Sequence, residues 1–208
     1  EPSGTIQAVT QVANPSAELD PYRLPRHTLP SRSDLVLEPD LAAASLSGTV
    51  DIVITSTGAP SELALNAIEL DIDTVTIDGA GAGFRLEEDT ERLFVTTPTP
   101  LADGEHVLHI EFRGTLNDKL RGWYRSVYRD TVGNDHTIAA TQMQSTDARR
   151  AFPCWDEPEF KAVFAVTLVV EADLIAVSNG REIARDTRTD GKVAVRFADS
   201  MVMSSYLV

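Results

Sequence analysis

Apolar and polar residues alternate along most of the chain from Ser33 onward. Alternation of this kind places every second side chain on one face of an extended strand, and the intervening Gly, Asp, Asn and Pro residues favour turns. The pattern predicts strands at 33–38, 46–56, 62–71, 73–78, 83–87, 92–97, 106–113, 137–144, 163–171, 175–178 and 193–197. A tight turn at Gly122 is expected to lead into a further strand at Trp123.

The predicted architecture is all-β, an antiparallel β-sandwich with a large sheet. Many short strands must pack face to face or close on themselves to hide their edges, and no segment of 12 residues shows convincing helical periodicity. A length of 208 residues suits one such domain, which we place at 21–208, and residues 1–20 are expected to form a tail or connector. The final residues, 201–208, have the composition of an unfinished apolar strand, for which we expect an unpaired edge.

The balance of charge narrows the range of partners. Lys and Arg number 18 against 32 Asp and Glu, a formal net charge of −14, so nucleic acid and anionic membrane surfaces would repel the chain. No apolar stretch approaches the roughly 20 residues of a transmembrane helix. Cys154 is the only cysteine, so no internal disulfide forms; a cytoplasmic location is favoured, and a secreted one stays open if a leader was removed.

The run from Thr141 to Pro158 is the most informative stretch of the sequence. Within it, Gln142 and Gln144 lie two positions apart and would project from one face of a strand. An amide oxygen accepts from an ammonium group and an amide nitrogen donates to a carbonyl, so the pair could hold the amino end of a peptide. The alternative is that both glutamines decorate a solvated strand, since Gln is mostly exposed in proteins. Spacing alone leaves both interpretations open.

Charged residues in the same run are expected to support structure. Asp156 and Glu157 point apart on an extended chain, which favours capping or ion pairing, with Arg149 or Arg150 as partners, over shared acid–base chemistry. Asp147 has the same strand parity as Arg149, and we expect these two to form a local pair.

Two further patterns resemble reactive sites. His106, His109 and Glu111 combine imidazole and carboxylate groups, yet positions 106 and 109 of a strand face opposite sides, which disfavours a metal site. Cys154 has no adjacent imidazole to form a thiolate, so we expect it to be a small buried side chain between Pro153 and Trp155.

The stretch 141–158 resembles the N-terminal domain of the aminopeptidase N family, zinc metallopeptidases of the gluzincin type. Further resemblances occur in the family's order at 22–25, 48–52, 63–67, 114–126, 178–179 and 203–207. One departure is Asn66, where members of the family often carry His. The resemblance implies a saddle-like β-sandwich, and it covers residues 22 to 208.

The resemblance also implies a function that this chain would not perform alone. Neither His-Glu-x-x-His nor Gly-x-Met-Glu-Asn occurs, so the ligands of the family's Zn²⁺ are expected beyond residue 208 and the fragment is expected to bind no metal and to be inactive. By resemblance, Gln144 meets the substrate's α-ammonium group, and Gln142 contacts the first residue or the polar groups around it. The expected partners are a peptide N-terminus and the chain's own downstream catalytic domain. The alternative function is a non-catalytic β-sandwich module for binding or adhesion.

Overall fold

The computed structural model describes Asp20 and residues 22–208. The described residues form thirteen strands and three short 3-10 helices. They are β1 (Thr28–Asp40), β2 (Ser45–Ser56), β3 (Glu62–Asn66), β4 (Leu70–Ile77), β5 (Ala80–Gly81), β6 (Gly83–Glu87), η1 (Glu88–Thr90), β7 (Arg92–Thr96), β8 (Gly104–Thr115), β9 (Gly122–Arg129), β10 (Asp135–Gln142), η2 (Ala148–Arg150), β11 (Val163–Val170), β12 (Glu182–Thr187), β13 (Val193–Phe197) and η3 (Ser205–Leu207). Apart from Asp20, the tail predicted for 1–20 lies outside the described residues, and among these no helix is long and apolar enough to cross a membrane.

An eight-stranded sheet forms the larger layer of the molecule, in the order β12-β13-β11-β1-β2-β8-β4-β5. Its strands pair antiparallel, except that β1 and β11 run parallel. The predicted alternation is realised in the middle of this sheet, where Val50 lies opposite Ile110 and Ile52 opposite Leu108, all at most 1% exposed. One face of the large sheet therefore carries the apolar side chains of the core.

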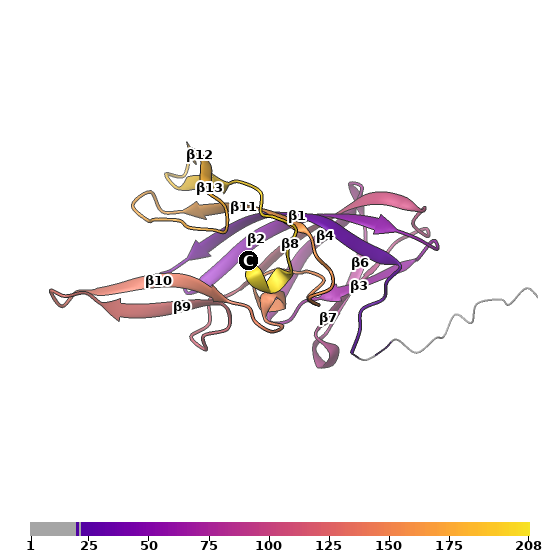
Figure 1. Ribbon diagram of the computed structural model, residues 1–208, viewed down its shortest axis with the longest axis horizontal. Helices are drawn as coiled ribbons and strands as arrows, with labels where there is room; N and C mark the ends of the chain where they lie inside the picture. Colours follow the sequence, from indigo (N-terminus) through magenta and orange to yellow (C-terminus); the bar gives the residue numbers. More distant parts are fainter. Residues whose placement is uncertain (1–19, 21) are drawn as a thin grey trace, which may run out of the picture.

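A three-stranded sheet, in the order β3-β7-β6, supplies the second layer. Leu63 and Leu65 of β3 and Leu93 and Val95 of β7 are completely buried and belong to the same apolar cluster as the core residues of the large sheet. Two sheets that share one core confirm the all-β sandwich. The three-stranded sheet and the free end of the β9–β10 hairpin lie toward opposite ends of the molecule (Figure 1).

The hairpin of β9 and β10 is a separate two-stranded sheet that projects from the body of the molecule (Figure 1). Its turn is closed by the carboxylate of Asp130, which accepts hydrogen bonds from the backbone N–H groups of Val132 and Asn134 at 2.9 and 2.8 Å. Gln142 pairs with Gly122 at the opposite end of the hairpin. The strand predicted at Trp123 is confirmed, and Gln142 stands at the base of the hairpin, where it joins the body.

The single strand predicted at 62–71 is wrong. The chain leaves β3 at Asn66, changes sheets, and enters β4 at Leu70. Glu69 adopts a left-handed conformation with φ 58°, which breaks an extended strand and which side chains other than Gly seldom adopt. Nothing in the composition of this segment signals that break.

Other elements also differ from expectation. Residues 175–178 form no strand, and Ile175 and Val177 are 89% and 77% exposed. The apolar strand expected at 201–208 is absent; an isolated bridge between Ala162 and Met203 is followed there by η3. After this bridge, the backbone N–H groups of Leu207 and Val208 donate within turns instead of to a neighbouring strand. The strand predicted at 137–144 ends two residues earlier, at Gln142, and β12 was not predicted.

Candidate functional site

The structure places Gln142 and Gln144 at the surface, one on each side of a buried residue. Met143 between them is 3% exposed and belongs to the core, whereas both glutamines are exposed. Among Asp20 and residues 22–208, the polar contacts of this segment are made by the charged residues that follow, and none is made by the two amides. Both amides are therefore free to meet a ligand, and their predicted role in substrate binding stays a prediction.

The chain after Gln144 is anchored tightly to the body. The backbone N–H of Asp147 donates to the carbonyl of Met143 at 2.9 Å, and η2 follows at once. Ala148, Ala151 and Phe152 are completely buried. The exposed amides thus stand on a segment whose backbone is held by both hydrogen bonds and packing.

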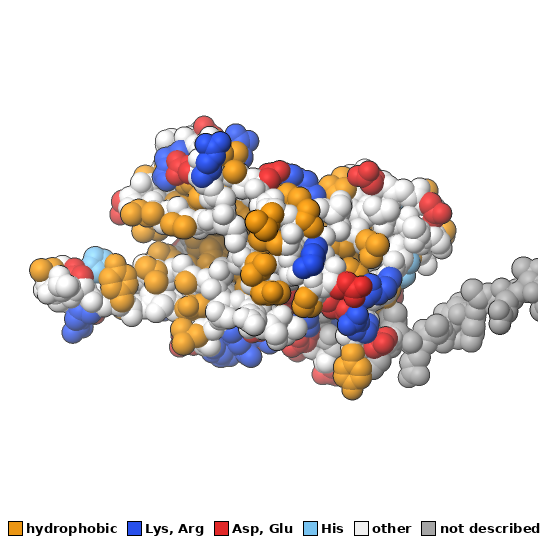
Figure 2. Space-filling view, in the orientation of Figure 1, with side chains coloured by type: hydrophobic (Ala, Val, Ile, Leu, Met, Phe, Trp, Pro, Cys, Tyr) orange, Lys and Arg blue, Asp and Glu red, His pale blue; other side chains and the backbone are white. Residues whose placement is uncertain are grey.

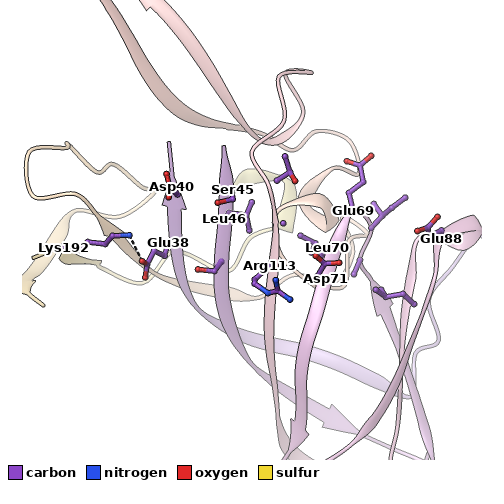
Figure 3. Close-up of a pocket in the computed structure, with 16 residues that line it drawn as sticks. Glu38, Asp40, Ser45, Leu46, Glu69, Leu70, Asp71, Glu88, Arg113 and Lys192 are labelled. Carbon is purple, nitrogen blue, oxygen red and sulfur yellow. Dashed lines mark hydrogen bonds and ion pairs between the residues drawn. The ribbon is translucent and has the colours of Figure 1, made fainter. Parts of the chain in front are cut away.

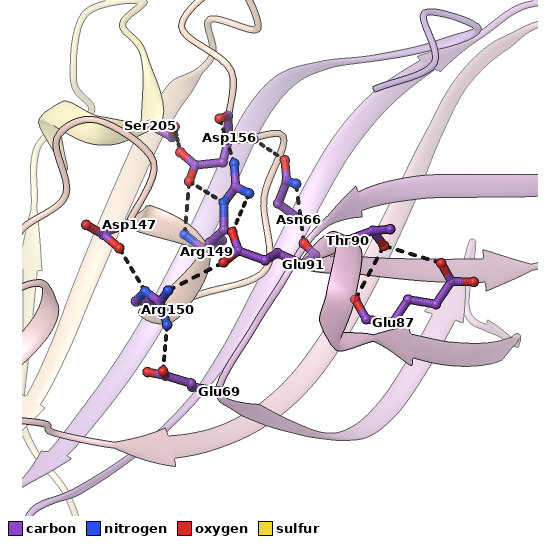
Figure 4. A network of polar contacts seen from close by, with 10 residues as sticks. All are labelled: Asn66, Glu69, Glu87, Thr90, Glu91, Asp147, Arg149, Arg150, Asp156 and Ser205. Atoms are coloured by element: carbon purple, nitrogen blue, oxygen red, sulfur yellow. Dashed lines mark hydrogen bonds and ion pairs between the residues drawn. The ribbon is translucent and has the colours of Figure 1, made fainter. Parts of the chain in front are cut away.

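Arg149 and Asp156 form a buried ion pair behind this segment (Figure 4). Arg149 Nε lies 3.0 Å from Asp156 Oδ2, and its Nη1 lies 2.8 Å from Glu91 Oε2. The side chain of Asp156 is 1% exposed, and its other oxygen accepts from Ser205 Oγ at 2.6 Å. The predicted ion pairing of Asp156 is confirmed, and the buried carboxylate has a partner on both oxygens.

Arg150 forms the second part of the network. Its Nε lies 2.7 Å from Asp147 Oδ1 and its Nη1 lies 2.7 Å from Glu69 Oε1. Burial disfavours its charge, but Asp147 and Glu69 outweigh burial and keep the pKa of Arg150 above its ordinary value. The pair expected between Asp147 and Arg149 is wrong, because in a 3-10 turn residues i and i+3, here 147 and 150, lie on the same side.

Gly122 brings the base of the hairpin against this network. It has φ +65°, and a Cβ atom there would lie 2.8 Å from Arg150 Cβ and 3.2 Å from the carbonyl oxygen of Asp147. Only a residue without a side chain permits this approach. Because Gly122 pairs with Gln142, the contact also fixes where the first glutamine stands.

Asn66 and Cys154 tie the network to the smaller sheet. Their backbones exchange hydrogen bonds of 2.8 and 3.1 Å, and Asn66 Oδ1 accepts from the N–H of Asp156 at 3.2 Å. Cys154 is 4% exposed, and burial raises the pKa of its thiol well above the usual value, so the thiol stays neutral. The predicted structural role of Cys154 is confirmed.

The two histidines of the 106–111 segment occupy different surroundings. His106 Nδ1 lies 2.6 Å from Asp78 Oδ2, whereas His109 Nδ1 lies 2.7 Å from Asp51 Oδ1. Within residues 20 and 22–208, no three His, Cys, Asp or Glu side chains are grouped so that they could hold a metal ion.

A polar cavity of about 660 Å³ lies near Glu69, between the ends of the large-sheet strands and the smaller sheet (Figure 3). Its ionisable lining residues are Glu38, Asp40, Glu69, Asp71, Glu88, Arg113 and Lys192. Lys192 Nζ lies 2.7 Å from Glu38 Oε1, and Glu69 is held by Arg150. Glu38 and Glu69 thus form ion pairs that join neighbouring elements.

Sequence reasoning missed several members of the network. Glu91, Ser205 and Glu69 come from distant parts of the chain, and no local spacing connects them with Arg149 or Arg150. Asn66 lies in the segment 63–67, which the resemblance had singled out, but its contacts with residues 154 and 156 needed the fold.

Comparisons with known proteins agree with this architecture. The family model described as "Peptidase M1 N-terminal domain" matches residues 29–207. Aminopeptidase M1-D of Oryza sativa subsp. japonica is 42% identical over 193 residues, which are 89% of this chain and 21% of that protein. Puromycin-sensitive aminopeptidase of Caenorhabditis elegans is 41% identical over 202 residues, 94% of this chain and 21% of that protein.

A yeast relative gives the same proportions. Alanine/arginine aminopeptidase of Saccharomyces cerevisiae is 37% identical over 193 residues, 89% of this chain and 22% of that protein. The chain thus spans about a fifth of the length of the curated relatives it matches. Because the family model covers most of the sequence, the chain belongs to the peptidase M1 family, in which it corresponds to the N-terminal domain.

Proposed function

We propose that this chain is the substrate-flanking domain of a zinc-dependent aminopeptidase, and that Gln142 and Gln144 receive the free amino end of a peptide. The observation that carries the proposal is the pair of exposed amides on either side of buried Met143, on a backbone anchored by η2. All three relatives named above are called aminopeptidases, which supports the assignment over an adhesion module. The full activity belongs to a longer parent protein.

The chemistry of an amide limits what this domain contributes. A neutral glutamine grips an ammonium group less strongly than a carboxylate does, since charge-assisted hydrogen bonds are roughly twice as strong. We assign the main counter-charge to a carboxylate of the parent's catalytic domain. In this account the glutamines orient the amino group.

The catalytic zinc ion belongs, in our proposal, to the downstream domain. The described residues offer no cluster of ligands, and the whole sequence lacks the paired imidazoles of His-Glu-x-x-His. When bound there, the metal would activate water for peptide hydrolysis. The 208-residue chain would supply only the surface that faces the amino end of the substrate.

The test is the effect of Gln144→Ala on the full-length parent enzyme. Loss of a hydrogen bond to a charged group costs about 1.5–3 kcal/mol, so kcat/KM for peptides with free N-termini should fall roughly 10-fold or more. Gln142→Ala should give a smaller loss. Thr131→Ala, at an exposed position in the far turn of the same hairpin, is the matched control and should leave kcat/KM unchanged.

An N-acetylated peptide provides the second control. It lacks the ammonium group and should be a poor substrate for the unaltered enzyme. If Gln144→Ala retains both its full kcat/KM and its full preference for free N-termini, the glutamine does not bind the amino end and the proposal fails.

A further inference from the structure

Two arginines lie below the surface behind the exposed glutamines. Many Lys, Arg, Asp and Glu side chains are scattered over the visible face of the molecule (Figure 2). The side chains of Arg149 and Arg150, by contrast, are only 11% and 9% exposed. A guanidinium group that is withdrawn from water needs a carboxylate close by, because its charge is otherwise left without solvation. The carboxylates that serve these two arginines therefore decide how η2 is held.

Glu91 contacts both arginines of η2 (Figure 4). Its Oε2 lies 2.8 Å from Arg149 Nη1, and its Oε1 lies 3.5 Å from Arg150 Nη2. Within the part of the chain that the structure describes, no other carboxylate pairs with both of them. The two oxygens of Glu91 therefore set the two guanidinium groups relative to each other.

The backbone of Glu91 has a conformation that a glutamate seldom adopts. Its φ is 53°, in the left-handed region, where a side chain crowds the backbone. Its N–H donates to the carbonyl of Glu88 at 3.1 Å, and its own carbonyl accepts from the N–H of Ala67 at 3.1 Å. Glu69, which also pairs with Arg150, has a left-handed backbone as well, with φ 58°. Strained residues of this kind persist only where the surroundings fix them, and they cluster at functional sites.

The turn that carries Gln144 is closed through Arg150. The N–H of Asp147 donates to the carbonyl of Met143 at 2.9 Å, which closes a turn in which Gln144 is the first exposed residue. The carboxylate of Asp147 is held in its turn by Arg150, whose Nε lies 2.7 Å from Asp147 Oδ1. Glu91 thus acts on the closing residue of the turn through one guanidinium group, and a contiguous chain of contacts of this kind can carry energetic coupling.

We propose that Glu91 is a positioning residue for Gln144, which it holds through the arginines of η2 in the place where the substrate's amino group is recognised. The inference rests on the proposed function. The alternative is that Glu91 only stabilises the fold. The two roles differ in one respect, because a positioning residue affects the reaction only while Gln144 is there to be positioned.

The test is a double-mutant cycle in the full-length parent enzyme, with kcat/KM for a peptide with a free N-terminus as the readout. Glu91→Gln keeps the size of the side chain and removes its charge. We expect it to lower kcat/KM roughly 3-fold or more when Gln144 is present, but less than about 1.5-fold in the Gln144→Ala background, because the effects of coupled residues are not additive.

Glu88→Gln is the matched control for the change of charge. Glu88 lies in η1, directly before Glu91, and its side chain is exposed and makes no ion pair with the described residues. This variant should leave kcat/KM unchanged in both backgrounds.

Glu91→Gly separates the loss of the carboxylate from the strain of the backbone. Glycine adopts a φ of 53° without steric cost, so this variant relieves the strain and still lacks the carboxylate. We expect it to lower kcat/KM as much as Glu91→Gln does, and again only when Gln144 is present. It also provides the measurement if Glu91→Gln does not fold.

Equal fold-losses of kcat/KM with and without Gln144 would overturn the inference and leave Glu91 a structural residue. Full kcat/KM in both Glu91 variants would overturn it too, as would failure of both variants to fold. Full kcat/KM in Gln144→Ala alone would instead reject the proposed function, and the positioning role with it. The same cycle therefore distinguishes the two failures.

Discussion

Gly122 lacks a side chain, and the geometry at the base of the hairpin depends on that. The residue has a positive φ, and its backbone lies against Arg150 and Asp147. This contact joins the strand that pairs with Gln142 to the ion-pair network. A single glycine therefore connects the position of the exposed amide with the buried charges.

We expect Gly122→Ala to lower the free energy of unfolding of the chain by roughly 2–4 kcal/mol, measured by urea denaturation. About 1–2 kcal/mol comes from the left-handed backbone and the rest from overpacking against Arg150. Gly133→Ala is the control: its φ is +96°, and a Cβ atom there has no neighbour within 4 Å. Gly133→Ala should lose only the roughly 1–2 kcal/mol that comes from the left-handed backbone. Equal losses of unfolding free energy in the two variants would show that the close approach of Gly122 to Arg150 is unimportant.

Asp156→Ala should be among the most damaging changes of a charged residue. Removing the carboxylate leaves Arg149, whose side chain is 11% exposed, without its buried partner, and breaking such a pair costs roughly 3–5 kcal/mol of unfolding free energy. Asp73→Ala breaks an exposed pair with Arg113 of similar geometry and should change stability little. Similar effects of the two variants in the same denaturation assay would contradict the role assigned to burial.

At the scale of elements, the alternation of apolar and polar residues predicted the central strands. Only one face of each of these strands is buried, so every second residue in the sequence is apolar. β2 and β8 show this, with one core-facing row in each. The prediction failed where one backbone angle decided the outcome, as at Glu69, and where an edge strand such as β12 has no buried row to reveal it. It also failed at 175–178, where apolar residues belong to an exposed groove rather than to a ladder.

The contact between β4 and β8 near Asp78 predicts a dependence of stability on pH. The carboxylate of Asp78 and the carbonyl of Ala102 raise the pKa of His106, and in turn His106 and the N–H of Val107 lower the pKa of Asp78. Because the pKa of His106 is raised in the fold, its contribution to stability is fully present below about pH 6.5 and is lost as pH rises. Because the pKa of Asp78 is lowered in the fold, its contribution to stability is present above about pH 4 and is lost as pH falls. Both contributions are present together between these values.

The measurement is the Tm of the chain and of its His106→Gln variant as a function of pH. The loss of Tm caused by the substitution should be largest between about pH 4 and 6.5 and should shrink above it, as the histidine becomes neutral. Asp78→Asn should give the same profile. A loss that is the same at pH 5 and pH 8 would show that the pair contributes through packing alone.

At the scale of the whole molecule, the edge that carries the two exposed glutamines and the buried network behind it differ in how far the sequence reveals them. Gln142 and Gln144 could be named from a short run, and the burial of Met143 between them follows the expected alternation. The support could not be named, because Glu91 and Ser205 reach residues 149 and 156 only through the packing of two sheets. Long-range pairing of this kind leaves no periodic signal in one sequence.

The most direct measurement of the central claim is the coupling between Gln144 and the α-amino group of a bound ligand. The inhibition constants of a peptide-like inhibitor and of its des-amino counterpart are compared for the full-length parent and for its Gln144→Ala variant. For each enzyme, the inhibition constant without the amino group is divided by the inhibition constant with it. If the amide holds the ammonium group, this ratio should be larger for the unaltered enzyme than for the variant, by roughly 10-fold or more. An equal loss of affinity in the two enzymes would contradict the assignment of this edge to the amino end of the substrate.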